Sequence, residues 1–276
     1  MSPPARRLIV NADDFGRSQS INAAVVQAHQ QGILMSASLM MNECACEEAV
    51  KLARENPRLG IGLHLTLLCG HSALAPDLIP GLVDSKGQFS EEPVRAGLRY
   101  FARRGLHDGL RREIHRQFQL FHETGLPLDH VNGHLHMHLH PVVFRILMED
   151  AESLGIRHMR LTREPFWLDA RLARGNRTYR SLHAAVYFFL SRRALPILDR
   201  KHIRHTSQVF GLLENDRVDE EYLLKLLPVL PPGDSELYSH PSLDNFKHEF
   251  QALISSRVKE EVVRQHIQLI RYADLT

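Results

Sequence analysis

The sequence predicts one α/β domain over residues 1–276, in which a parallel sheet of about seven strands curls into a distorted (β/α) barrel similar to the TIM barrel. Short apolar, β-branched segments alternate with longer segments of helical period, which is typical of β–α units around a parallel sheet. A chain of 276 residues lies within the range of one barrel. A count of about seven units favours a closed or nearly closed barrel over an open doubly wound sheet.

The first quarter of the chain supplies three predicted strands and two helices. Residues 8–11 are apolar and begin the sheet. Ser20 then suits the N-cap of a helix that Gly32 can end in a left-handed turn. The elements that follow are a strand over 33–41, a helix over 45–55 and a strand over 59–67.

The remainder continues the alternation after a long loop over residues 68–87, which is rich in Gly, Pro and Asp. Loops of this length often carry function. The predicted helices are 90–104, 108–124, 141–154 and a region near 181–198, and the predicted strands are 129–135, 156–161, 207–210 and 236–239.

The composition argues against a nucleic-acid partner. The 34 Lys and Arg residues nearly balance the 32 Asp and Glu residues, which leaves a formal charge of only +2. The three cysteines suit reduced thiols, and no segment has the apolar length of a signal-peptide core or a membrane-spanning helix. We therefore expect a cytoplasmic protein.

A basic segment over residues 177–204 departs from this balance. Between Arg171 and His205, nine Arg or Lys residues stand against the single Asp199, and they flank the aromatic residues 187–189. Such a composition can rest on an anionic membrane surface, which makes peripheral membrane association one interpretation. A contact within a homo-oligomer is an equally simple one.

Polar side chains follow the ends of four different predicted strands. They are the adjacent Asp13 and Asp14, then His64, His134 and His240. In a barrel, the carboxyl ends of the strands converge on one face, where active sites are built. Because neighbouring side chains diverge, Asp14 can bind a metal ion while Asp13 acts as general base. The alternative is that this Asp pair only turns the chain and caps the next helix.

The histidines give the second part of this prediction. His64 interrupts a run of strand-forming residues, and five histidines occupy alternate positions from 130 to 140, apart from 132. An extended chain would place His134, His136 and His138 on one side. We expect His134, nearest the strand end, to be the ligand, and His136 and His138 to line the substrate pocket or to orient the ligands.

Three further residues complete the candidate site. His240, after a late strand, can donate a proton to a leaving amine, although a surface histidine before a turn proline would look the same. Arg160 and Arg163 lie at another strand end and can bind substrate or orient the carboxylate base, while an ion pair with Glu164 is the simpler alternative. Asp14, His64 and His134 would leave coordination positions open on one divalent ion, zinc or magnesium, as catalysis requires.

At these residues the sequence resembles the YdjC-type carbohydrate deacetylases. The resemblance rests on N-A-D-D-F-G, G-L-H-L, the histidine cluster that ends in proline, and the later His-Pro pair. It implies a distorted barrel, a divalent ion on Asp14, His64 and His134, and Asp13 as the base. Many relatives carry Asp-Ser where this chain has Asn132-Gly133, so support of His134 by a carboxylate is not expected here.

Within that family, L-P-L-D-H-V-N-G-H-L-H-M-H-L-H-P and M-R-L-T-R-E-P look most like the hopanoid-biosynthesis-associated branch. That resemblance implies removal of acetyl from an N-acetylglucosaminyl lipid, with release of acetate. Deacetylation of chitooligosaccharides is the nearest alternative. A metal-dependent phosphoesterase and a non-catalytic sugar-binding module also remain open, and acetate release would distinguish them from a deacetylase.

Overall fold

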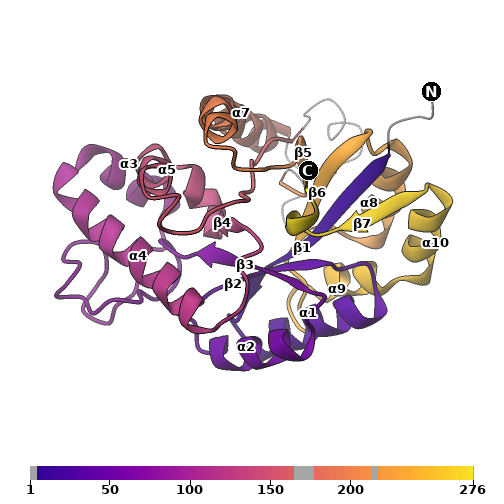
Figure 1. Cartoon of the computed structure of the whole chain (residues 1–276), viewed down its shortest axis with the longest axis horizontal. Coiled ribbons are helices and arrows are strands. Elements are labelled where there is room, and N and C mark those ends of the chain that lie inside the picture. The colour runs from indigo at the N-terminus through magenta and orange to yellow at the C-terminus, as the bar shows by residue number, and fades with distance from the viewer. Residues whose placement is uncertain (1–4, 165–176, 213–216, 276) are drawn as a thin grey trace.

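The computed structural model describes residues 5–164, 177–212 and 217–275, and in this part of the chain a seven-stranded parallel sheet forms the centre (Figure 1). The strand order is β4-β3-β2-β1-β6-β5, and β7 pairs with β1. The strands are β1 (Arg6–Phe15), β2 (Ser36–Leu39), β3 (Gly60–Leu65), β4 (Val131–Gly133), β5 (Gln208–Phe210), β6 (Gly233–Ser239) and β7 (Ile267–Ile270).

The sheet curls, and the segment around Met159 lies between its two edge strands. Val131 of β4 donates its N–H to the carbonyl of His158, and the N–H of Met159 donates to the carbonyl of Arg204, a few residues before β5. The predicted strand over 156–161 is therefore present only as isolated bridges. These bridges bring the sheet close to closure, which confirms the predicted distorted barrel.

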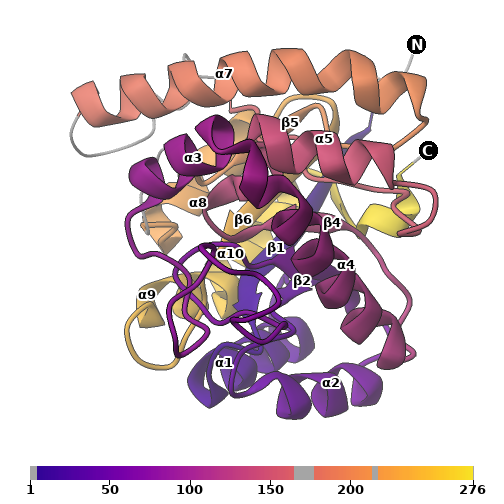
Figure 2. The same cartoon turned by 90° about the vertical axis from the view of Figure 1, so that its left-hand side faces the viewer.

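Helices cover the outside of the sheet, with α1 and α2 on one side and α3, α5 and α7 grouped on another (Figure 2). The α-helices are α1 (Gln19–Gln31), α2 (Cys46–Glu55), α3 (Pro93–Ala102), α4 (His107–Glu123), α5 (Pro141–Glu149), α7 (Arg177–Arg200), α8 (Glu220–Leu226), α9 (Lys247–Ile254) and α10 (Ser256–Arg264). The 3-10 segments are η1 (Arg104–Leu106), η2 (His134–Leu139), η3 (Leu227–Val229) and η4 (Tyr272–Asp274). β1 is buried from Leu8 onward, as expected for a parallel strand covered on both faces.

The boundaries of α1 differ from the prediction. Ser18, not Ser20, is the N-cap, and its hydroxyl accepts from the N–H of Ile21. Gly32 ends the helix, but its φ of −122° is not left-handed. A Cβ at position 32 would lie 2.2 Å from the carbonyl oxygen of Leu253, so close packing against α9 explains this glycine.

The histidine cluster is not extended, and the predicted alternation of sides is wrong. β4 ends at Gly133, and the next residues form η2, where Leu135 and His136 have φ values of 49° and 56°. The turn of η2 serves two contacts. It directs His134 to Asp14 and His138 to the carbonyl of Arg160, whereas an extended chain would hold both side chains on one side.

Candidate metal centre

The end of β1 separates the two adjacent carboxylates. Asp14 has a left-handed φ of 63°, a conformation that Asp tolerates better than most residues. The chain turns there, since the N–H of Arg17 donates to the carbonyl of Asp14. Both side chains are buried, and the turn directs Asp14 and Asp13 to different sets of partners.

Asp14, His64 and His134 converge on one point. The distances are 3.0 Å from His134 Nδ1 to Asp14 Oδ1, 3.3 Å from His64 Nε2 to the same oxygen, and 3.4 Å between the two nitrogens. Ligand atoms about 3.3 Å apart fit a tetrahedral ion with bonds of about 2.0 to 2.1 Å. These buried groups could therefore hold a metal ion.

The charge state of Asp14 suits a ligand. Burial raises the pKa of Asp14, but the nearby His134 and His64 outweigh it and bring the pKa well below its usual range. Arg17 donates to Oδ2 at 2.8 Å, which leaves Oδ1 facing the two histidines. An ionised carboxylate and two imidazoles occupy three positions around an ion and leave at least one for a water or substrate.

Asp13 lies beside this cluster and is held by Arg160. The guanidinium donates to both carboxylate oxygens, at 2.6 and 2.8 Å. Burial raises the pKa of Asp13, but Arg160 and His64 outweigh it, so the carboxyl pKa lies far below its usual range. Asp13 therefore stays ionised at any working pH, and a bidentate contact fixes its orientation.

Arg160 contacts carboxylates rather than solvent. It is fully buried, and it donates to Glu236 Oε1 from Nε at 2.9 Å and from a terminal nitrogen at 2.6 Å. Its guanidinium also lies 4.5 Å from the centre of the Tyr238 ring. Of the two roles that the sequence left open for Arg160, this geometry favours orienting the carboxylate base. Arg163 lies apart, with an exposed side chain and its carbonyl bonded to the N–H of Val209.

His136 and His138 form an inner wall beside Arg160. His136 bonds the hydroxyl of Tyr238 at 3.2 Å, and His138 Nε2 donates to the carbonyl of Arg160 at 3.0 Å. Burial, followed by the charge of Arg160, lowers the pKa of His136 well below its usual range and lowers that of His138 to about 3. Both rings are therefore neutral near pH 7.

The low pKa of His138 predicts acid sensitivity. Between pH 6.5 and about 3, the unfolded chain carries a proton on this ring that the folded chain does not, so stability falls as the pH decreases. The full slope is about 1.4 kcal/mol per pH unit for one such group. We expect urea unfolding at pH 7, 6 and 5 to show a shallower decline for His138→Gln, whose amide can still donate to Arg160. The exposed His266 supplies the control, and His266→Asn with the same effect would contradict this assignment.

His240 follows β6 on the same side as Asp13. It is half-buried, and its charge is one of several that lower the pKa of Asp13 after burial has raised it. Its ring lies 5.7 Å from that of Tyr238, edge to face, and its N–H donates to Glu249 at 2.6 Å. The structure thus brings His240 near the carboxylate proposed as base.

Several residues of this network were missed at the sequence level. Asn11, Ser38 and Asn132 all donate to Asp13 or to one another, Glu236 holds Arg160, and Tyr272 donates its hydroxyl to Glu236. The available signal was a polar residue within an otherwise apolar strand. That signal shows that a partner exists but not which partner it is.

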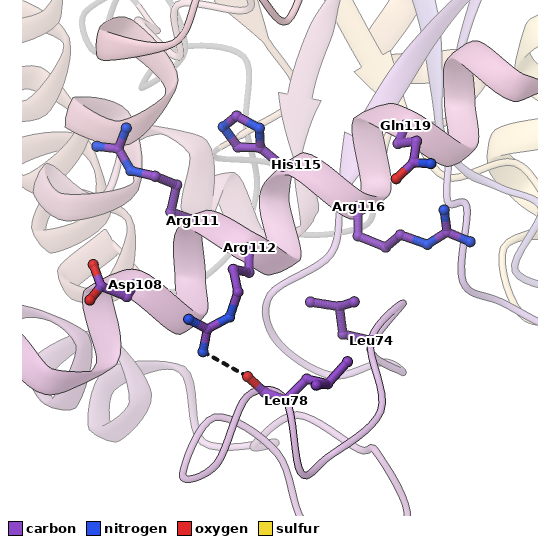
Figure 3. Close-up of a pocket in the computed structure, with 8 residues that line it drawn as sticks. All are labelled: Leu74, Leu78, Asp108, Arg111, Arg112, His115, Arg116 and Gln119. Carbon is purple, nitrogen blue, oxygen red and sulfur yellow. Dashed lines mark hydrogen bonds between the residues drawn. The ribbon is translucent and has the colours of Figure 1, made fainter.

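A surface pocket of about 500 Å³ lies away from this cluster, between α4 and the loop over residues 68–87 (Figure 3). It is lined by Leu74, Leu78, Asp108, Arg111, Arg112, His115, Arg116 and Gln119. Arg111 pairs with Asp150, and Arg112 donates to the carbonyl of Leu78. Arg116 pairs with Glu123, so two of the three arginines that line this pocket are already held in ion pairs.

Comparison with known proteins places these features in a family. The YdjC-like protein family matches residues 7–264. The carbohydrate deacetylase of Brevibacillus brevis is 41% identical over 150 residues, 54% of this chain and 57% of that protein. The chitooligosaccharide deacetylase of Proteus mirabilis is 37% identical over 57% of this chain and 60% of that protein.

Matches that cover nearly the whole chain have a lower sequence identity. The carbohydrate deacetylase of Clostridium beijerinckii is 29% identical and covers 98% of this chain and 100% of its own length. The chain covers less than two thirds of the Brevibacillus and Proteus relatives. A solved structure from Enterococcus faecalis V583 has the same fold, with a TM-score of 0.72 at 22% identity over 97% of this chain and 98% of its own. The match to residues 7–264 shows that the chain belongs to the YdjC-like family.

Proposed function

We propose that this chain is a metal-dependent deacetylase that hydrolyses the N-acetyl group of an N-acetylglucosamine-type sugar. The observation that carries the proposal is the buried convergence of Asp14, His64 and His134 beside the ionised Asp13. The relatives named as carbohydrate and chitooligosaccharide deacetylases support the substrate class. The proposal gives the four residues the roles of three ligands and one general base.

In this mechanism a divalent ion supplies Lewis acidity toward the acetyl carbonyl and makes a nearby water more acidic. Asp13 accepts a proton from the attacking water while Arg160 keeps the carboxylate aligned. Because the pKa of Asp13 lies so low, the carboxylate would hold this proton only transiently and release it to solvent, from which His240 regains the proton it donates. The carbon–nitrogen bond then breaks, and His240 donates a proton to the departing amine. Acetate and a free amino sugar result.

The direct test uses mass spectrometry. N-acetylated chitobiose and an N-acetylglucosaminyl lipid are each incubated with zinc-loaded, magnesium-loaded and chelator-treated protein. We expect loss of acetyl in the metal-loaded samples and none after chelation. Two imidazole ligands suit zinc better than magnesium, so the zinc-loaded sample should be the faster. Phosphate release from a phosphoester without acetate release would favour a phosphoesterase, and binding of sugar without turnover would favour a binding module.

We further propose that the substrate is lipid-linked, as on a hopanoid glycolipid, and that α7 contacts an anionic membrane surface. Tyr187 of α7 lies 5.1 Å from the ring of His136, so this helix borders the site. On its outer face Phe188 and Phe189 are 50% and 68% exposed. The adjoining Arg192 and Arg193 are exposed too, and aromatic and basic residues together favour binding to anionic membranes.

The side chains of Arg177 and Arg180, which the sequence placed in the basic segment, lie outside the described residues. None of the helices in the described ranges has the length and apolar character to cross a membrane. Contact would therefore involve one face of α7. A homo-oligomer through the same face remains the alternative.

Cosedimentation with vesicles tests the contact. We expect the protein to sediment with phosphatidylglycerol vesicles at low salt, less with phosphatidylcholine vesicles, and the double variant F188S/F189S to lose most of this binding. Val263 of α10 is 74% exposed, and Val263→Ser supplies a surface control. Absence of binding at low salt, or equal binding by both variants, would contradict the membrane proposal. A shift from dimer to monomer in F188S/F189S would instead support the oligomer.

A further inference from the structure

Asn132 of β4 connects the candidate base to a candidate metal ligand. Its side chain is fully buried. Its amide nitrogen donates to Asp13 Oδ1 at 3.1 Å and to the hydroxyl of Ser38 at 2.7 Å. Its amide oxygen lies 2.8 Å from His64 Nδ1. One side chain therefore contacts the groups proposed to accept the proton and to bind the ion.

The chemistry of these partners fixes the direction of each bond. The carboxylate of Asp13, whose two oxygens both accept from Arg160, can only accept, so the amide group that faces it must be the NH₂. The carbonyl oxygen then faces His64 and can only accept, which requires the proton of His64 to sit on Nδ1. The lone pair of His64 is consequently on Nε2, the nitrogen that lies 3.3 Å from Asp14.

We infer that Asn132 is a positioning residue that sets the tautomer of His64 for metal binding and, through the same amide, holds Asp13 in place. This inference rests on the proposed function, because it assigns a ligand role to His64 and a base role to Asp13. The family resemblance described in the sequence analysis linked position 132 to the support of His134. The geometry points instead to His64, whose backbone pairs with that of Asn132 in the sheet.

Asn11 of β1 provides a matched control within the same network. It is also fully buried, and its amide nitrogen donates to Asp13 Oδ1 and to the hydroxyl of Ser38, both at 2.8 Å. Its amide oxygen has no hydrogen-bond partner among the described residues. Asn11 thus duplicates the contact of Asn132 with Asp13 but not its contact with His64.

The test compares N132L with N11L by zinc titration calorimetry and by steady-state kinetics of acetate release. Both variants lose a donor to Asp13, so both should lower kcat with little change in KM. Only N132L loses the partner of His64, and partners of metal-bound histidines contribute about 10- to 100-fold in affinity. We therefore expect the zinc dissociation constant to rise by about that factor in N132L and to stay near the wild-type value in N11L.

N132D supplies the rescue of zinc binding alone, because one carboxylate oxygen can still accept from His64 while the other faces Asp13 and cannot donate to it. We expect its zinc affinity to return to at least the wild-type value. If N132L does not fold, Asn132→Ser, which is too short to reach His64, should show the same loss of zinc affinity. If N132L, or N132S in its place, binds zinc with the same affinity as N11L, the inference is overturned. Suppose that the zinc affinities follow the expected order, with N132L weaker than wild type, N132D and N11L, while the wild-type protein releases no acetate. In that case the proposed function fails and the role of Asn132 in metal binding stands.

Discussion

Asp13→Asn should abolish most deacetylation while leaving metal binding intact. Loss of a positioned general base lowers rates by about 10²- to 10⁴-fold, and we expect kcat to fall near the middle of that range. Asparagine has the shape of aspartate and can still accept from Arg160, but it cannot take a proton from water. Asp14, His64 and His134 are unchanged, so calorimetry should give a zinc dissociation constant close to that of wild type.

The structural cost of this substitution can be separated from its catalytic effect. Removing one partner of a buried ion pair costs about 3 to 5 kcal/mol when the remaining charge is left alone. Arg160 keeps Glu236, so we expect a smaller loss, measured as the shift in urea midpoint. Asp234, which pairs with Arg7 near the start of β1, supplies a control for the same chemical change. We expect Asp234→Asn to release acetate at the wild-type rate. If Asp13→Asn also released acetate at that rate, Asp13 would not be the base.

His134→Ala should lose both metal and activity. Its Nδ1 lies 3.0 Å from Asp14, and without it only Asp14 and His64 remain as ligands. Even partners that only support a ligand contribute about 10- to 100-fold to metal affinity, so removal of a ligand should exceed the upper value. Zinc titration measures the first loss, and acetate release measures the second.

His136→Asn is the control, because it changes a histidine of the same segment and Asn tolerates the positive φ found there. We expect this variant to bind zinc normally, since His136 bonds Tyr238 and Thr162 rather than Asp14. Wild-type zinc affinity in His134→Ala, or equal losses in both variants, would show that His134 is not a ligand. Equal losses of zinc affinity are expected of a phosphoesterase in which His134 and His136 both bind metal.

The convergence of Asp14, His64 and His134 could be predicted because it follows from a general property of parallel sheets. Three strands that run in one direction bring their carboxyl ends to one edge, so the position of each residue after its strand was sufficient. The distorted barrel followed from the alternation of strand and helix in the same way. These predictions needed only local patterns and one rule about their assembly.

The remainder depended on contacts that a local pattern does not contain. The histidine segment turns at Leu135 and His136, where it brings His134 to Asp14, a residue 120 positions earlier in the chain. Arg160 and Glu236 lie 76 residues apart, and their pairing depends on how the segment around Met159 meets β6. β7 was missed because its four residues give no periodicity to detect.

The chain of contacts from Tyr272 through Glu236 and Arg160 to Asp13 also orders the events of biosynthesis. β1, which carries Asp13, leaves the ribosome before the other described strands, and Tyr272, which follows β7, leaves it after all of them. Until then Glu236 lacks the hydroxyl that bonds it. The residues of the Asp14, His64 and His134 cluster are thus all synthesised before the residue that completes the support of Asp13. Full support of Asp13 would therefore follow the synthesis of Tyr272 and could not precede it.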